Sequence, residues 1–421
     1  MAVVELPYVR GEILRSTEDD LAKVERAWRE IARRRASGEP LYNLTGLERS
    51  LSVPADALDL MDDELASALT LERLRALALE HLGGQRGRDD VVVCNRTTAA
   101  LVAAIGTTVA AGETVVGISA GYTHPAVLRA AALAGAEFVD TTTVAELETA
   151  LARHEPTLVV ATRLAVTYDM LDVEVLDAAI SAARASGARV LLDDAGGARV
   201  GPAVFGQPRT LELDVDVGVT GLDKYGTLGP RLGLLAGRRE LVAAARARAF
   251  ELGLEARPLL YPAVVESLER YDPERVRVLV ATTRDVAAAL RTRLGALVHE
   301  TPVTAQLRGE DVREHAGGGG TVAPYEAAAA LAMLLLVDHG ILTVHFAAVP
   351  PGTSAILFKF VPPETLERLG GAERLAAAVA EALGRLRALI GDSERVRELL
   401  FDAPERASTI DRWQSRTRSR S

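Results

Sequence analysis

The chain has 421 residues, of which 48% are hydrophobic and 25% are charged, and its formal net charge is −10. This composition is typical of a globular protein with a sizeable core, and the acidic balance argues against a broad nucleic-acid-binding surface. The single cysteine, Cys94, excludes an internal disulfide framework and fits a reducing cytoplasm. We expect it to be a core residue at a strand end, not a nucleophile.

Neither the N-terminus nor the longest apolar run predicts a signal sequence or a membrane span. The first seven residues lack a basic region followed by an apolar stretch, and the uncharged run at 327–337 is too short to cross a bilayer. We therefore expect a cytoplasmic protein.

Apolar periodicity predicts two helices, at residues 18–35 and 62–82, before the pattern changes near residue 90. From there, short β-branched runs alternate with amphipathic helices, which is typical of strands covered on both faces in a mostly parallel sheet. The expected strands are residues 91–94, 114–118, 158–161 and 189–192, and the expected helices are 98–109, 125–134 and 173–185. Two further runs, 215–219 and 232–235, have no helix between them, so we expect an antiparallel or mixed edge.

Past residue 255 the pattern becomes that of a smaller α+β domain. The expected elements are helices at 273–294, 325–337 and 364–389, and strands at 304–307, 341–346 and 355–361. The predicted organisation is an α/β fold: an N-terminal helical segment over 1–45, a large domain with a mainly parallel sheet over 46–255, a small C-terminal α+β domain over 256–405, and a basic, frayed tail over 406–421. The four glycines at 317–320 are expected to form a flexible turn, with an active-site loop as the alternative.

Lysine occurs at only three positions, Lys23, Lys224 and Lys359, and every other basic residue is arginine. Arginine can replace lysine wherever only positive charge is needed, but it cannot form an imine with an aldehyde. Lys23 lies among charged residues on what is predicted to be an exposed helix, so compositional bias is enough to explain it. Lys224 has no such surroundings, which makes it a candidate for amine chemistry.

Three motifs surround this candidate. Asn95-Arg96-Thr97-Thr98 follows a strand and opens a helix, where hydroxyls and free backbone N–H groups can hold a phosphate; an ordinary helix cap is the alternative. Asp193-Asp194-Ala195 ends a strand, where a carboxylate can pair with a protonated pyridine nitrogen and the small alanine leaves room beneath a flat ring. A Mg²⁺ site built from the two acids is the alternative, but no P-loop accompanies it.

Lys224 lies in the third motif, a glycine-rich turn between two strands and about 30 residues after the acids. Glycines permit unusual backbone conformations that can direct an amine inward, and a buried lysine loses its proton readily, as imine formation requires. A surface hairpin that happens to carry a lysine is the alternative.

A phosphate cradle, an acid at a strand end and a lysine, in this order, resemble fold-type I pyridoxal phosphate (PLP) enzymes. The resemblance implies a large domain with a mainly parallel, seven-stranded type of sheet and a smaller C-terminal domain. Four stretches narrow the resemblance to the SelA-like group, relatives of bacterial L-seryl-tRNA(Sec) selenium transferase that include archaeal homologues. They are Tyr42-Asn-Leu-Thr-Gly46, Asn95-Arg-Thr-Thr-Ala-Ala100, Asp193-Asp-Ala-Gly-Gly-Ala-Arg199, and Asp223-Lys224 followed by Gly229-Pro-Arg-Leu-Gly-Leu-Leu-Ala-Gly237. The likeness covers roughly residues 40–240.

The resemblance implies a role for each residue of these motifs. Lys224 would form the internal aldimine with PLP, and Asp193 would pair with the pyridine nitrogen. Arg96, Thr97 and Thr98 would hold the phosphate. His124 would stack on the ring, since Tyr122 can equally point into the core. Ala195 and Thr220 complete the expected cofactor site, and no metal ligands are expected.

Two residues are candidates for substrate binding. Many PLP enzymes for free amino acids carry an arginine on a small-domain strand that binds the α-carboxylate. The similar strand here carries Lys359, which is either that clamp or an edge-strand residue without a catalytic role. Tyr42 is the second candidate.

The expected reaction is β-elimination or β-replacement on a small amino-acid-like substrate. An aminotransferase is the first alternative, because the same carbanion can be reprotonated on the cofactor. A non-catalytic PLP-binding or RNA-interacting relative is the second, disfavoured by the intact Lys224 and Asp193 and by the net charge. A nicotinamide enzyme is disfavoured because no Gly-x-Gly-x-x-Gly follows the early strands. The family's proteins are usually dimers, so we expect a homodimer or a higher homo-oligomer.

Overall fold

The computed structural model describes residues 6–318, 320–347, 349 and 351–402. It divides the chain into two compact units. The first contains Leu47–Val280, and the second joins Tyr8–Gly46 to the chain from Ala281 on. This division differs from the predicted one, because the N-terminal helical segment belongs to the same unit as the C-terminal part and the boundary falls within helix α10 (Pro273–Leu294), not near residue 255. The predicted basic tail lies outside the described residues.

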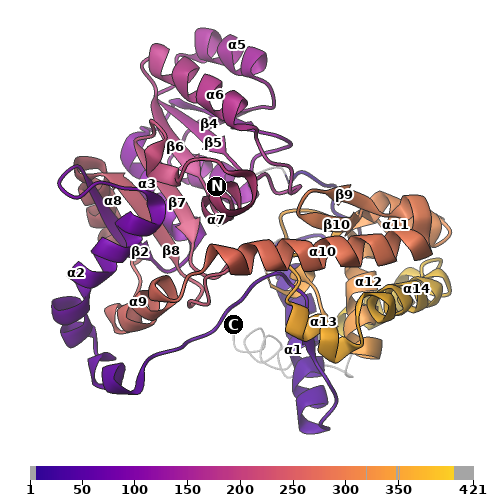
Figure 1. The fold of residues 1–421 in the computed structure, drawn as a ribbon. Coiled ribbons are helices and arrows are strands. Elements are labelled where there is room, and N and C mark those ends of the chain that lie inside the picture. The colour runs from indigo at the N-terminus through magenta and orange to yellow at the C-terminus, as the bar shows by residue number, and fades with distance from the viewer. Residues whose placement is uncertain (1–5, 319, 348, 350, 403–421) are drawn as a thin grey trace, which may run out of the picture. The chain divides into compact units, whose positions relative to one another are not determined.

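A seven-stranded sheet forms the centre of the first unit, in the order β2-β8-β7-β6-β5-β3-β4 (Figure 1). Its strands are β2 (Asp89–Cys94), β3 (Thr114–Ser119), β4 (Glu137–Thr141), β5 (Leu158–Thr162), β6 (Arg189–Asp193), β7 (Val217–Gly221) and β8 (Gly233–Arg238). The strands from β7 to β4 are parallel, and β8 runs antiparallel to both β7 and β2. The predicted mainly parallel sheet with a direct return is confirmed.

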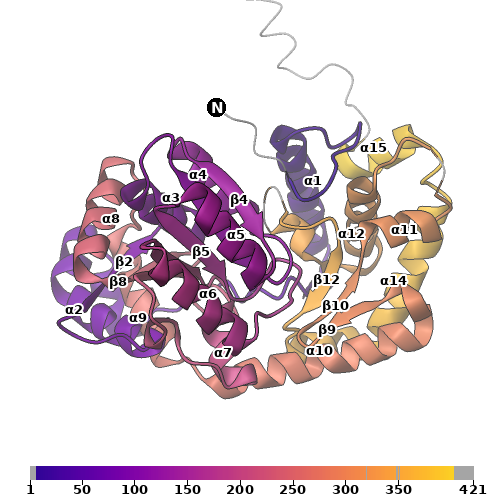
Figure 2. The ribbon, with the colours of Figure 1, turned by 90° about the horizontal axis from the view of Figure 1, so that it is seen from above.

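Helices cover both faces of this sheet (Figure 2). One face is covered by α3 (Thr97–Thr108), α4 (Pro125–Leu133) and α8 (Arg239–Glu251). The other face is covered by α2 (Asp63–Leu82), α5 (Val144–His154), α6 (Val173–Ala185), α7 (Gly197–Phe205) and α9 (Tyr261–Glu269). This unit also contains short 3₁₀ turns at Ala55–Leu60, Thr210–Glu212 and Pro258–Leu260. The sequence pattern missed β4 because it is an edge strand with Glu137 and Asp140 among its five residues, so it shows no apolar run.

Two small sheets and a helical core form the second unit. Strand β1 (Tyr42–Asn43) pairs with β11 (Ile341–Leu342), and β9 (His299–Thr301), β10 (Thr304–Leu307) and β12 (Ile356–Lys359) form an antiparallel sheet. The helices are α1 (Thr17–Ala36), α10, α11 (Gly309–His315), α12 (Pro324–His339), α13 (Pro363–Leu369), α14 (Ala372–Arg387) and α15 (Ser393–Phe401), with 3₁₀ turns at Gly295–Leu297 and Val344–Phe346. The predicted helix over 364–389 is interrupted because Gly370 and Gly371 both have positive φ, 102° and 90°.

Helix α12 is the core of this unit, since all residues from Tyr325 to Leu336 are buried. Among the residues that the structure describes, no helix is both long and apolar enough to span a membrane.

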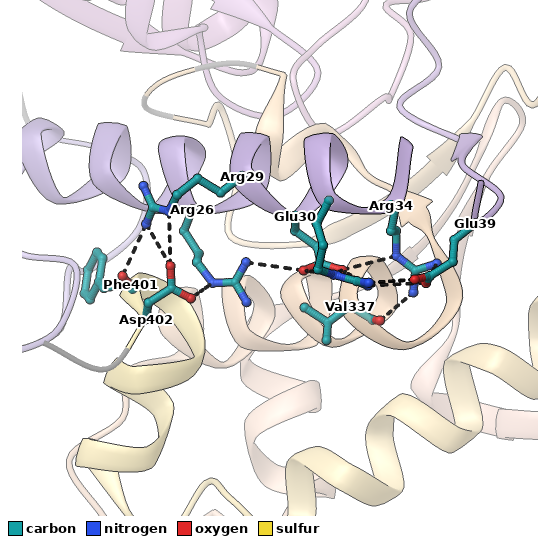
Figure 3. Close-up of polar contacts among 9 residues, drawn as sticks. Arg26, Arg29, Glu30, Arg34, Glu39, Val337, Phe401 and Asp402 are labelled. Carbon is teal, nitrogen blue, oxygen red and sulfur yellow. Dashed lines mark hydrogen bonds and ion pairs between the residues drawn. The ribbon is translucent and has the colours of Figure 1, made fainter. Parts of the chain in front are cut away.

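A row of ion pairs along α1 joins it to the ends of α12 and α15 (Figure 3). Arg29 and Arg26 both pair with Asp402, the first with 3.0 Å between Nη2 and Oδ2. Glu30 accepts contacts from Arg34, whose Nη2 also donates to the carbonyl of Val337 at 2.5 Å. Pairs as exposed as Arg29 and Asp402 contribute little stability. The Glu30–Arg34 pair lies within α1 itself and orients Arg34, whose hydrogen bond to the Val337 carbonyl connects α1 to α12.

Lys23 lies on α1 and is fully buried, so the prediction that it is an exposed surface residue is wrong. Its Nζ lies 3.1 Å from Asp20 Oδ1 and donates to Tyr325 Oη at 3.0 Å. Burial lowers the pKa of Lys23 below its ordinary value, against the effect of Asp20. The charged residues around Lys23 are typical of an exposed helix. The burial of Lys23 depends on a contact with Tyr325, 302 residues away in sequence, which the local pattern does not predict.

Replacing Lys23 with methionine should destabilise the second unit. Asp20 would remain buried with only part of its charge compensated by Arg10, whose Nη2 lies 2.8 Å away. We expect a loss of about 3 kcal/mol in the free energy of unfolding, near the lower end of the cost of breaking a buried ion pair. Urea unfolding followed by circular dichroism measures it.

Arg35→Met is the matched control, because Arg35 is an exposed residue of the same helix. Its substitution should change the free energy of unfolding by less than about 0.5 kcal/mol. Equal effects of the two substitutions would contradict the buried network.

Candidate cofactor site

Lys224 lies in the turn between β7 and β8, at the carboxyl end of the parallel strands. The turn is closed by Thr227, whose hydroxyl donates to the Lys224 carbonyl at 2.8 Å and accepts from the Lys224 N–H at 3.3 Å. The following residues, Tyr225 and Gly226, both have positive φ, 50° and 92°. The side chain of Lys224 is 19% exposed, so its amine is accessible from a largely enclosed site.

Asp223 is the nearest charged partner of this amine. Its Oδ1 lies 3.2 Å from Lys224 Nζ, and its Oδ2 lies 2.7 Å from Arg49 Nε. Burial alone would raise the pKa of Asp223, but Lys224 and Arg49 outweigh burial and lower it far below its ordinary value. Asp223 was not predicted as a site residue, although its position directly before Lys224 was a usable signal.

The amine of Lys224 and the N-terminus of α3 meet at Gly221. A Cβ atom on Gly221 would lie 2.4 Å from Lys224 Nζ and 2.9 Å from Thr97 Oγ1, so only glycine leaves room for both. Arg96 is the N-cap residue of α3, and its side chain forms no capping hydrogen bond. Because the first N–H groups of a helix have no partner within it, those of Thr97 and Thr98 in this 12-residue helix can bind an anion. Their role in holding a phosphate remains a prediction.

The two adjacent acids at the end of β6 lie in different environments, because successive side chains of a strand point to opposite faces. Asp194 is fully buried, with Oδ2 3.0 Å from Arg163 Nη2 and 2.7 Å from Thr210 Oγ1. Asp193 is 2% exposed, and its Oδ1 accepts from the Ala195 N–H at 3.3 Å. Burial raises the pKa of Asp193 to about 6, while Lys224 acts in the opposite direction.

This arrangement does not support the alternative of a Mg²⁺ site built from both acids. Asp194 is already paired with Arg163, and within the described part of the chain no three His, Cys, Asp or Glu side chains are grouped to hold a metal.

Two buried hydroxyls extend the face on which Asp193 lies. Ser119, Thr162 and Asp193 are paired in register at the ends of β3, β5 and β6, so their side chains point to the same side of the sheet, the side covered by α3 and α4. Ser119 Oγ and Thr162 Oγ1 are buried and have no hydrogen-bond partner among the residues that the structure describes. Buried polar groups are normally paired, so these two hydroxyls can hydrogen-bond to a polar ligand on this face.

His124 lies at the N-cap of α4, close to this face. Its Nδ1 accepts from the Ala126 N–H at 3.0 Å. Burial, together with the nearby positive charges of Lys224 and Arg129, lowers the pKa of His124 to about 4. The imidazole is therefore neutral at pH 7, which suits stacking on an aromatic ring.

Thr220 is the predicted cofactor residue that the structure does not bring to this group. Strand alternation turns it to the opposite face from Asp193, where its hydroxyl accepts from Arg199 Nη1 at 3.0 Å. Arg199 also donates from Nη2 to the Gly221 carbonyl at 2.5 Å, so it stabilises the end of β7 from the face opposite Asp193.

The predicted substrate residues, Tyr42 and Lys359, belong to the second unit. Lys359 is the last residue of β12 and only 1% exposed. A Cβ atom on Gly46 would lie 2.4 Å from the Lys359 carbonyl oxygen and 3.1 Å from its Nζ, so the end of the Tyr42-to-Gly46 motif packs directly on this lysine. Their role in substrate binding remains a prediction.

Comparison with known proteins identifies the family. No protein-family model matches the chain. A UPF0425 pyridoxal phosphate-dependent protein of Methanothermobacter thermautotrophicus is 31% identical over 364 residues, which cover 86% of this chain and 92% of that protein. The chain belongs to the UPF0425 family of pyridoxal phosphate-dependent proteins. Its cofactor is PLP, as the names of further relatives from Methanosphaera stadtmanae and Methanococcus maripaludis also state.

Solved structures show the same fold for this UPF0425 protein. Alanine–glyoxylate aminotransferase from Nostoc superimposes with a TM-score of 0.58 at 15% identity, covering 82% of this chain and 96% of that one. N-Succinyldiaminopimelate aminotransferase from Mycobacterium tuberculosis gives 0.58 at 17% identity, with 88% and 98% covered. The fold is therefore that of fold-type I PLP transferases. The narrower SelA-like assignment is not shown by these matches.

The residues of the UPF0425 site fit PLP chemically. The cofactor carries a phosphate, a basic ring nitrogen, a ring hydroxyl and an aldehyde. This face of the sheet offers an uncapped helix N-terminus, the buried carboxyl of Asp193, the unpaired hydroxyls of Ser119 and Thr162, and the amine of Lys224.

The different surroundings of Asp193 and Asp194 predict opposite effects of replacing each by asparagine. Because burial raises the pKa of Asp193 to about 6 from 3.8, the folded protein without cofactor holds a proton that the unfolded chain has released at intermediate pH. This group's contribution to stability is full below about pH 4 and is lost as pH rises through about 6, by roughly 3 kcal/mol. Asp193→Asn should remove that pH dependence and weaken PLP binding.

Asp194→Asn should instead destabilise the protein by about 3–5 kcal/mol, because it leaves the buried Arg163 without its partner. Unfolding of both variants between pH 4 and 8, without and with PLP, measures these effects. If Asp193→Asn destabilises the cofactor-free protein as strongly as Asp194→Asn does, the division of roles is wrong.

Proposed function

We propose that this protein is a PLP-dependent enzyme that acts on an amino-acid-like substrate by β-elimination or β-replacement, with Lys224 as the residue that bonds the cofactor. The observation that carries the proposal is the position of the Lys224 amine, which shares the space at Gly221 with Thr97 and lies on the same face of the sheet as Asp193. The resemblance of four sequence motifs to the SelA-like group supports the same reaction class.

Each predicted residue has a separate task in this proposal. Arg96, Thr97 and Thr98 bind the phosphate through the N-terminus of α3. Asp193 binds the ring nitrogen and keeps it protonated, and His124 packs on the ring as a neutral group. Bound PLP supplies an electron sink for the bond that breaks at the substrate α-carbon.

Lys224 also moves a proton in this proposal. With the substrate amine bound to the cofactor in place of Lys224, the Lys224 amine would be free to remove the proton from the substrate α-carbon. Asp223, at 3.2 Å from Nζ, holds the amine in position and stays ionised throughout.

The arginines beside Lys224 can also accommodate an anionic β-substituent of the substrate. Burial lowers the pKa of Arg231 to about 10, and the positive charges of Arg49 and Arg96 contribute in the same direction. Arginines that crowd one another in this way are stabilised by an anion. A departing carboxylate, phosphate or comparable group would meet that need, and Lys359 remains the candidate for the substrate α-carboxylate.

Transamination is the second candidate, because both solved structures described above are named as aminotransferases. The amine form of the cofactor accumulates in transamination, whereas elimination releases an oxo acid and ammonia and leaves the cofactor unchanged. We also expect the enzyme to act as a homodimer.

Borohydride reduction of the protein with PLP, followed by peptide mass spectrometry, tests the assignment of Lys224. The cofactor should be fixed on the peptide that contains Lys224. Lys224→Ala should remove the label and lower turnover of an active amino acid by about a thousandfold or more, because general base catalysis is lost together with covalent binding. Labelling at another residue would contradict the proposal.

Lys359→Gln is the matched control, since it removes another nearly buried amine. It should still be labelled on Lys224. If Lys359 binds the substrate carboxylate, the variant should raise KM roughly tenfold or more with a smaller change in kcat. Assay of oxo-acid, ammonia and cofactor form in the same samples separates elimination from transamination.

A further inference from the structure

Two tyrosines near Lys224 share an unusual backbone conformation. Among the described residues, five that are not glycine have positive φ, and two of these are Tyr168 at 67° and Tyr225 at 50°. Their hydroxyl oxygens lie 3.1 Å apart, within hydrogen-bonding distance. Bulky residues rarely adopt this conformation, and where they do, surrounding contacts must hold them and the site is often functional.

Tyr225 connects this pair to the predicted cofactor residues. It directly follows Lys224 and is 2% exposed. A Cβ atom on Gly196 would lie 2.5 Å from Tyr225 Cε2, so the ring packs against the backbone that follows the Asp193-Asp194-Ala195 strand end. Burial raises the pKa of Tyr225 well above its ordinary value, which keeps the phenol as a neutral hydroxyl.

Tyr168 comes from the loop between β5 and α6, a segment that the sequence motifs did not include. The loop turns tightly there, with the Tyr168 N–H donating to the Ala165 carbonyl at 2.9 Å. The same loop also touches the segment that leads to His124, because a Cβ atom on Gly121 would lie 2.7 Å from Thr167 Oγ1. One loop therefore contacts both the segment that leads to His124 and the turn that carries Lys224.

We propose that Tyr168 is a positioning residue for Lys224, which it holds through the hydrogen bond to Tyr225. The φ angle of Tyr225 sets the direction in which the chain leaves Lys224, and the Thr227 hydrogen bonds close the turn. Without the Tyr168 hydroxyl, the turn loses one of the contacts that hold the backbone of Tyr225 at positive φ. The side chain of Lys224 then adopts orientations in which its amine no longer points toward the cofactor. This inference rests on the proposed role of Lys224 in bonding PLP.

Structural and positioning roles can be separated with single and double substitutions. Tyr168→Phe or Tyr225→Phe alone removes the hydrogen bond between the two phenols and leaves one hydroxyl without this partner, which lowers the thermal unfolding midpoint. The double variant removes both hydroxyls and should recover most of that midpoint, since replacing both partners by apolar groups is nearly neutral. A merely structural role predicts that the double variant also recovers its reaction with the cofactor.

The experiment measures three quantities on the full chain: the unfolding midpoint without cofactor, the Kd for PLP, and the rate at which PLP becomes trapped on Lys224 by borohydride. We expect all three variants, including the double one, to be trapped roughly tenfold more slowly than the wild type. Tyr8→Phe, which removes a phenol hydrogen bond in the second unit, is the control and should be trapped at the wild-type rate.

Two outcomes overturn different claims. A double variant that is trapped as fast as the wild type would overturn the positioning role and leave the assignment of Lys224 intact. Absence of trapping on Lys224 in the wild type would overturn the proposed function and this inference with it.

Discussion

The buried ion pair between Asp194 and Arg163 is the interaction on which the rest of the candidate site depends. It pairs one of the two neighbouring carboxyl groups at the end of β6 with an arginine, and leaves Asp193 as the acid of the two that lies on the face covered by α3 and α4. Two glycines make the pair possible, because a Cβ atom on Gly197 would lie 2.3 Å from Asp194 Oδ1 and one on Gly201 would lie 2.6 Å from Arg163 Nη1. The start of α7 is thus shaped around an arginine that the sequence motifs did not single out.

Part of this architecture could be read from the sequence, because it depends on local patterns. Alternating apolar runs and amphipathic helices predicted the parallel sheet, and the two flanking runs around Lys224 predicted its antiparallel edge. The acid at the end of β6, the helix opening at Thr97 and the lysine in the turn were all visible as short motifs. The structure brings them to one edge of the sheet because the carboxyl ends of parallel strands meet there.

The features that the sequence did not predict depend on contacts between segments that are far apart in the chain. Charged neighbours made Lys23 look like a surface residue, yet Tyr325 buries it. Arg163 and Tyr168 lie in a loop with no recognisable motif, and only the folded chain shows that they contact Asp194 and Tyr225. The side chain of Thr220 points to the opposite face of the sheet from Asp193, which the spacing of the motif alone does not reveal.

The single cysteine has a further consequence. Cys94 ends β2 with no exposed surface, and burial together with Glu255 raises the pKa of its thiol to about 12. Alkylation requires an accessible thiolate. While the first unit is folded, the thiol of Cys94 is buried and protonated, so it does not react with maleimide or iodoacetamide. The chain thus carries a built-in reporter: the rate of its chemical modification follows how often this sheet edge opens, with no background from any other thiol.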